Sequence, residues 1–127
     1  MSKIEEIELR TQLEQVTEEC GELTKACMKL IRALGNGNPC DISKEEALEN
    51  VVEEMSDVGV ALDFLVDKIS QEFGIDADDI WQKIGDIGVE KTERWERRLA
   101  DAEQSGSGGS AAVDGCCDSD SCSIEGF

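Results

Sequence analysis

Two acidic clusters with the same internal spacing are the residues of this chain best suited to chemistry. They are Glu18, Glu19 and Glu22 in the first cluster, and Glu53, Glu54 and Asp57 in the second. At about 100° per residue, the three positions of each cluster fall within roughly one quadrant of an α-helix. If the two helices pack together, the carboxylates converge, and their repulsion favours protonation or a shared cation. Ligands that are all oxygen favour Mg²⁺, with Mn²⁺ as the second candidate.

A solvated helix face is the alternative explanation for each cluster, because one third of the chain is charged. Two observations favour a metal site instead. The same pattern occurs twice on the same side of an apolar stripe, and few basic residues are placed to neutralise it. Lys25 follows Glu22 by three residues and can pair with it, but the position four residues after Asp57 is Ala61.

Composition excludes several classes of function. The 127 residues include no histidine and have a formal net charge of -18. Histidine-dependent triads, Cys-His dyads and histidine-ligated zinc are therefore excluded within one chain. The charge argues against binding to nucleic acid polymers or anionic lipid. No apolar run approaches the roughly 20 residues of a membrane span, and the N-terminus is too acidic for a signal peptide. We expect a cytoplasmic protein without a membrane partner.

The elements that must position the clusters are predicted to be long helices. Apolar residues in steps of three and four predict a first helix over about 4–34, which ends at the Gly-Asn-Gly-Asn-Pro segment 35–39. Ser43 and Glu46 have the form of a capping box, so a second helix begins there and ends near residues 73–74. A break near Gly59 would divide this helix in two.

A third helix is expected after Asp76 and Asp79, which can cap it, and a kink is considered at Gly85 or Gly88. It continues to about residue 99. We expect a domain over residues 1–103, followed by a flexible tail rich in Gly, Ser and Cys over 104–127.

These patterns predict an all-α fold of long antiparallel helices that form a bundle. The helices of the two clusters are expected to meet along an apolar seam. Its residues are Val16, Cys20, Leu23 and Cys27 in the first helix and Val51, Met55, Val58 and Leu62 in the second. Three helices bury little surface alone, so we expect dimerisation to complete the bundle, as a homodimer or homotetramer.

The segments EECGEL at 18–23 and EEMSDV at 53–58 together resemble the signature of the MazG-like, all-α nucleoside triphosphate pyrophosphohydrolases. The similarity covers roughly residues 9–99. It implies Mg²⁺-dependent hydrolysis of (d)NTPs between the α and β phosphates, which yields a nucleoside monophosphate and pyrophosphate. The Mg²⁺ ligands implied are Glu19, Glu22, Glu54 and Asp57. A remaining carboxylate, Glu18 or Glu53, could accept a proton from water.

Basic and amide side chains are the candidates for contact with the substrate. The family places basic residues of its last core helix against the phosphates, which suggests Lys91 and Arg94 here, although both could pair instead with neighbouring glutamates on a surface helix. Lys25 lies one turn beyond Glu22 on the first helix. Gln15, one turn before Glu19, could reach a polar group of the substrate.

Two other readings remain open. The same fold could act on dUTP or dUDP, like the dimeric dUTPases, or on a phosphoribosyl nucleotide, like phosphoribosyl-ATP pyrophosphohydrolase. The chain could instead be a non-enzymatic acidic helical interaction module, whose carboxylates are solvated or bind Ca²⁺ weakly. The sequence lacks EF-hand loops, which weakens the calcium version.

Overall fold

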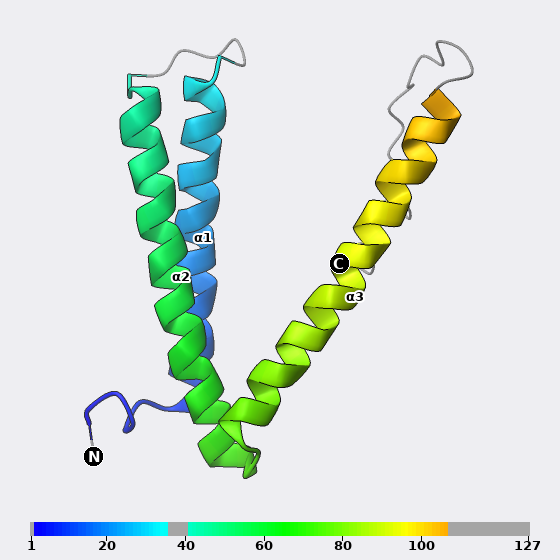
Figure 1. Cartoon of the computed structure of the whole chain (residues 1–127). Helices are drawn as coiled ribbons and strands as arrows, with labels where there is room; N and C mark the ends of the chain where they lie inside the picture. The colour runs from blue at the N-terminus through cyan, green and yellow to red at the C-terminus, as the bar shows by residue number, and fades with distance from the viewer. Residues whose placement is uncertain (1, 36–40, 107–127) are drawn as a thin grey trace. The chain divides into compact units, whose positions relative to one another are not determined.

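A computed structural model describes residues 2–35 and 41–106 of the chain. Within these ranges there are three helices and no strand, so the fold is all-α. The helices are α1 (Leu9–Ala33), α2 (Lys44–Phe73) and α3 (Ala77–Gly106) (Figure 1). The chain divides into two compact units, Met1–Trp81 and Gln82–Phe127. Helices α1 and α2 belong to the first unit, and most of α3 belongs to the second.

Both ends of α2 follow from local chemistry, and their prediction is confirmed. The Ser43 hydroxyl accepts a hydrogen bond from the Glu46 backbone N–H at 3.1 Å, which makes Ser43 the N-cap. Gly74 ends the helix with φ at +65°, a left-handed conformation that glycine adopts without a steric penalty. Helix α2 runs through Gly59 without a break.

Helix α3 begins at Ala77, where the Asp76 carboxylate accepts a hydrogen bond from the Asp78 backbone N–H at 2.8 Å. It is assigned as a single helix through Gly85 and Gly88. It includes residues 104–106 as well, where the flexible tail was expected to begin. The rest of the expected tail and residues 36–40 of the expected turn lie outside the described residues.

The segment before α1 is not helical, contrary to the prediction of a helix from residue 4. Residues 3–6 are assigned as turn, with the Glu5 N–H donating to the Ser2 carbonyl and the Ile7 N–H to the Ile4 carbonyl. Contacts with α2 and α1 hold this segment. Lys68 donates a hydrogen bond to the Glu5 carbonyl at 3.2 Å, and Gln12 donates one to the Ile4 carbonyl at 3.5 Å. Tertiary contacts therefore take precedence here over helical periodicity.

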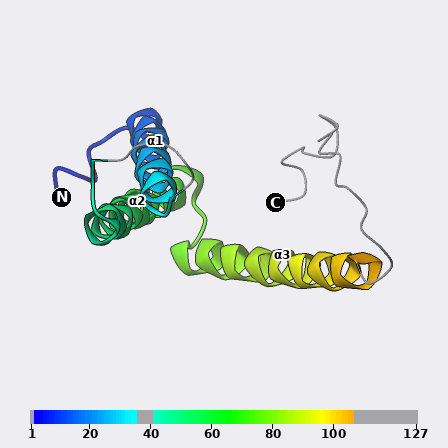
Figure 2. The ribbon, with the colours of Figure 1, turned by 90° about the horizontal axis from the view of Figure 1, so that it is seen from above.

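Helices α1 and α2 lie side by side and antiparallel (Figures 1 and 2). The residues buried in this pair are mostly small: Ala26, Ala47, Ala61 and Val66, with Gln12 as the buried polar side chain. Alanine at a helix contact lets the two backbones approach closely, so close packing along small side chains joins the pair.

The predicted seam is wrong at three of its eight positions. Cys20, Met55 and Leu62 are exposed, while the other five seam residues are half-buried. The contact follows a row on each helix that shares Val16 and Leu23, or Val51 and Val58, with the seam but includes Glu19 or Glu54 in place of the exposed seam residues. In α1 this row is Gln12, Val16, Glu19, Leu23 and Ala26, and in α2 it is Ala47, Val51, Glu54, Val58 and Ala61. Both rows advance in steps of four and three residues, so the spacing fits them as well as it fits the seam.

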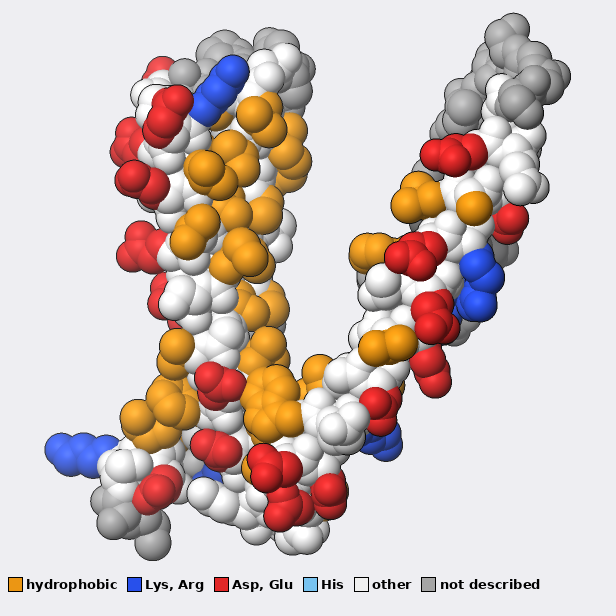
Figure 3. Space-filling view, in the orientation of Figure 1, with side chains coloured by type: hydrophobic (Ala, Val, Ile, Leu, Met, Phe, Trp, Pro, Cys, Tyr) orange, Lys and Arg blue, Asp and Glu red, His pale blue; other side chains and the backbone are white. Residues whose placement is uncertain are grey.

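Large apolar side chains therefore remain exposed on the first unit. Among them are Met28, Ile31, Leu48, Val52 and Met55, and the last two are each 58% exposed. Figure 3 shows apolar side chains running along the α1–α2 pair, with acidic ones gathered along one edge. None of the helices in the described ranges has the length and apolarity needed to cross a membrane.

Candidate metal centre and its adjoining cavity

Three of the predicted metal ligands come together between α1 and α2. Glu19 of α1 faces Glu54 and Asp57, which lie one turn apart on α2. One carboxylate oxygen of each residue lies within 4.8 Å of the other two. Glu19 and Glu54 are half-buried and Asp57 is exposed. The two half-buried carboxylates belong to the contact rows of their helices, so helix packing itself brings them together. We call these three residues the acidic triad.

The fourth predicted ligand, Glu22, is held by a different partner. Its carboxylate accepts a hydrogen bond from the Lys25 ammonium group at 2.8 Å, and both side chains are substantially exposed. This hydrogen bond and the charge of Lys25 lower the pKa of Glu22. The pairing of Lys25 with Glu22 was foreseen from their spacing. It leaves the Glu22 carboxylate outside the acidic triad, although close enough to affect it.

The electrostatics of the triad favour a cation. Loss of hydration around Glu54 is the main cause that raises the pKa of its carboxyl group, and the negative charges of Asp57, Glu22, Glu19 and Glu53 add to it in that order. The pKa of Lys25 is raised as well. The main cause is its hydrogen bond to Glu22, followed by the negative charges of Glu22, Glu18 and Glu54. A divalent cation at the triad would reduce this repulsion directly.

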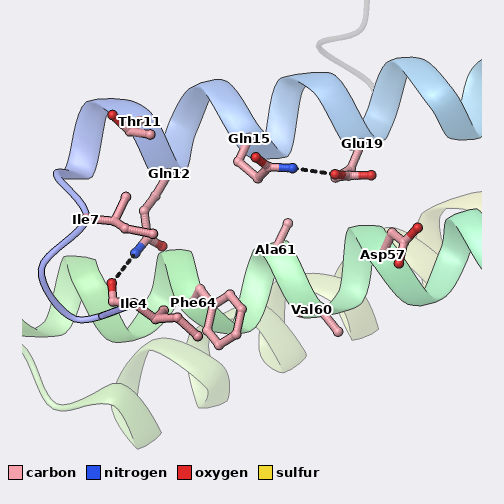
Figure 4. Close-up of a pocket in the computed structure, with 10 residues that line it drawn as sticks. All are labelled: Ile4, Ile7, Thr11, Gln12, Gln15, Glu19, Asp57, Val60, Ala61 and Phe64. Carbon is pink, nitrogen blue, oxygen red and sulfur yellow. Dashed lines mark hydrogen bonds between the residues drawn. The ribbon is translucent and has the colours of Figure 1, made fainter. Parts of the chain in front are cut away.

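The donor set fits Mg²⁺. The triad supplies only carboxylate oxygens, which are hard ligands, and three protein carboxylates leave coordination positions for water or other oxygen ligands. An amide supports one of them, since Gln15 donates a hydrogen bond from its side chain to the Glu19 carboxylate (Figure 4). Such a bond orients a ligating carboxylate. Gln15 was predicted to contact the substrate, and the structure places it on Glu19.

A cavity of about 270 Å³ adjoins the triad within the first unit. Figure 4 shows its lining from the N-terminal segment, α1 and α2. Apolar side chains form one part of the wall, namely Ile4, Ile7, Val60, Ala61 and Phe64. The polar side chains of Thr11, Gln12 and Gln15 come from α1, and the triad residues Glu19 and Asp57 also line the cavity. An apolar compartment beside a candidate cation site suits a ligand with one apolar and one anionic part.

Sequence reasoning missed Gln12 and the N-terminal segment as parts of this site. A helix that began at residue 4 would continue the axis of α1 and would not fold back onto α2. The predicted helix therefore gave no indication of the cavity. The sequence contains one indication that Gln12 is buried. It lies four residues before Val16 and seven before Glu19, in the same 4-3 row, so it is a polar residue on the contact face of α1.

The remaining predicted site residues lie around the triad or in the second unit. Glu18 and Glu53 are exposed neighbours of triad residues along α1 and α2. Lys91 and Arg94 are half-buried on α3, one turn apart, in the unit Gln82–Phe127. Their contact with substrate phosphates remains a prediction.

Comparisons with protein families, with curated proteins and with solved structures found no match for this chain. The resemblance to MazG-like enzymes therefore rests on the paired acidic motif and the helical layout of the chain itself.

Proposed function

We propose that the chain is a Mg²⁺-dependent nucleoside triphosphate pyrophosphohydrolase of the MazG-like kind, which converts (d)NTPs to monophosphates and pyrophosphate. One observation supports this most directly. Glu19 of α1 and the neighbouring pair Glu54 and Asp57 of α2 bring carboxylate oxygens within 4.8 Å of one another beside a largely apolar cavity. A cation held there could bind the phosphates, while the cavity receives another part of the nucleotide.

Residues of both acidic clusters have distinct roles in this proposal. Glu19, Glu54 and Asp57 would hold Mg²⁺, and Glu22 would join them if Lys25 turned towards the phosphates. When bound, Mg²⁺ supplies positive charge for the phosphates and activates water as a nucleophile. Glu18 and Glu53 are the candidates to accept a proton from that water, since each adjoins a triad residue. Gln15 keeps the Glu19 carboxylate in position.

A second copy of the chain would complete the molecule in this proposal. The exposed apolar side chains of the α1–α2 pair support self-association, because a face of this kind is unfavourable in water. We propose a homodimer or homotetramer in the cytoplasm, in which Lys91 and Arg94 approach substrate phosphates.

Pyrophosphate release from a panel of NTPs and dNTPs tests the reaction. We expect release in excess Mg²⁺, none in EDTA, and a fall of at least about 100-fold in Asp57→Asn, since even the groups that only support metal ligands contribute 10- to 100-fold. Asp63→Asn is the matched control, because Asp63 is an exposed aspartate of α2 outside both clusters.

Two outcomes would overturn the proposal. Release that is unchanged in Asp57→Asn would move the chemistry away from the triad. No release from any NTP or dNTP, with helical content intact, would favour phosphoribosyl substrates or the interaction module. A panel that includes dUTP, dUDP and phosphoribosyl-ATP separates the enzymatic alternatives.

A further inference from the structure

Gln12 has a buried side-chain amide, and its oxygen lacks a hydrogen-bond partner in the part of the chain that the structure describes. The residue is only 6% exposed, and no other polar residue in the described ranges is buried. The amide nitrogen donates to the Ile4 carbonyl at 3.5 Å, a long hydrogen bond. The amide oxygen has no hydrogen-bond partner among the described residues. Since the Ile4 carbonyl can only accept, the nitrogen must face it, and the oxygen is the group left unpaired.

Buried polar groups in native proteins nearly always have partners, so an unpaired one needs an explanation. Gln12 lines the cavity, and Figure 4 shows its amide next to the apolar side chains of the N-terminal segment and α2. The oxygen is enclosed in the present conformation. The last torsion of a glutamine side chain is broad, and the hydrogen bond that holds this amide to Ile4 is long. Rotation about this torsion would present the oxygen to a ligand in the cavity.

The cavity has the size and character of a pocket for one flat ring system. Its volume of about 270 Å³ is near the lower end of ligand pockets, so it suits part of a nucleotide and not the whole. Phe64 offers an aromatic face for stacking, and Ile4, Ile7 and Val60 supply apolar contact. Most of the wall would contact a base without regard to its identity.

The distance between Gln12 and the triad matches the layout of a nucleotide. Gln12 and Glu19 lie on the same face of α1, two turns or about 10 Å apart. A nucleoside can span this separation, with its base near Gln12 and its phosphates near Glu19 and Asp57.

We propose that this cavity binds the nucleobase of the substrate, and that the Gln12 amide oxygen accepts a hydrogen bond from an N–H group on the edge of the base. This inference rests on the proposed function for the phosphate end of the ligand, but not for the base end. Gln12 would thus be a specificity-determining residue. It would favour nucleotides over triphosphates that carry no base.

The test compares Gln12→Met with the wild type. Methionine has a similar length and no unpaired oxygen, so we expect the unliganded variant to be at least as stable as the wild type. We expect KM for NTPs to rise about tenfold with kcat little changed, because one hydrogen bond to the bound base is lost. Hydrolysis of inorganic tripolyphosphate, which has no base, should be unaffected.

Binding without turnover separates this inference from the proposed function. Titration of AMP, CMP, GMP and UMP into the wild type in EDTA, where no turnover is expected, should shift the NMR signals of Ile4, Ile7 and Phe64. At least one monophosphate should bind about tenfold more weakly to Gln12→Met. Should that variant fail to fold, Phe64→Leu, at a position 37% exposed, tests the same cavity and should weaken binding too.

Unchanged KM and unchanged monophosphate binding in Gln12→Met would overturn the inference, as would shifts that avoid the cavity residues. Loss of pyrophosphate release alone would overturn only the proposed reaction, since the monophosphates would still bind in the cavity.

Discussion

Glu54 is a half-buried carboxylate of the triad with four acidic neighbours. Partial burial and four neighbouring acids raise its pKa above the ordinary value of 4.5 in the folded protein. A group with a raised folded pKa contributes stability below its unfolded pKa and loses that contribution as the pH rises through the folded value. The ionised Glu54 therefore destabilises the metal-free protein at neutral pH.

Glu54→Gln should consequently raise the melting temperature of the metal-free protein at pH 7. The difference should vanish below about pH 4, where the wild-type carboxyl is protonated as well. Mg²⁺ should raise the melting temperature of the wild type by binding the folded state, and should do so less in the variant. Thermal melts by circular dichroism in EDTA and in Mg²⁺ measure both effects. Equal melting temperatures at pH 7 in EDTA would show that the repulsion is negligible.

Lys25 has the opposite effect on a neighbouring carboxylate, Glu22. It lowers the pKa of Glu22, so this pair contributes stability above the ordinary carboxyl range, and the contribution is lost as the pH falls through the lowered value. The pair is exposed, and its effect on stability is small.

Lys25→Met should separate the two roles of this ammonium group. Without its positive charge, Mg²⁺ should bind a few-fold more tightly in the absence of nucleotide, because Glu22 becomes available and repulsion falls. If Lys25 also binds phosphate, KM for NTPs should rise in the same variant. Calorimetric Mg²⁺ titration and steady-state kinetics measure the two effects. Tighter Mg²⁺ binding with an unchanged KM would show that Lys25 pairs with Glu22 and does not bind phosphate.

Within α2, the N-cap contributes stability without touching the site. Ser43 lies about three turns before Glu54, and its hydroxyl accepts a single backbone hydrogen bond. Ser43→Ala should lower the free energy of unfolding by about 1 kcal/mol and leave turnover unchanged. Urea denaturation measures the first and pyrophosphate release the second. Lys44→Ala, at the next position, is the control and should change neither.

The packing of α1 against α2 predicts which positions tolerate larger side chains. Ala26 is 5% exposed in the contact row, whereas Met28 on the same helix is 45% exposed. Ala26→Leu should cost about 1–3 kcal/mol through overpacking. Met28→Leu should change stability by less than about 1.5 kcal/mol, since it conserves volume. A harmless Ala26→Leu, measured by the same denaturation, would mean that the helices meet along the originally predicted seam.

At the scale of the whole molecule, we expect the exposed apolar side chains of the α1–α2 pair to drive self-association of the chain. Met55 and Val52 are each 58% exposed on α2. Met55→Lys should shift the protein from dimer or tetramer to monomer, because a charge on an interface that excludes water is unfavourable. Asp63→Lys controls for the added charge. Analytical ultracentrifugation gives the masses, and a wild-type monomer would refute this prediction.

Local chemistry in the sequence was enough to predict three helices and both ends of α2. Ser43 caps a helix because its hydroxyl reaches a backbone N–H three residues later, and Gly74 ends one because glycine tolerates positive φ. The repeated acidic spacing likewise predicted that Glu19, Glu54 and Asp57 would converge, because residues three and four apart share one helix face.

Packing between the helices and the N-terminal segment determined which helix faces meet and where the cavity forms. Two overlapping rows on each helix have the same 4-3 spacing, and the row with the larger apolar residues is the more obvious candidate for the contact. The structure instead joins the rows that contain Ala26 and Ala61, since small side chains let the backbones approach, and this choice brings Glu19 and Glu54 into the contact. The cavity at Gln12 exists only because residues 2–8 fold back onto the helices, through contacts such as Lys68 to Glu5 that join positions far apart in the chain. Periodicity describes one helix at a time and contains no information about such contacts.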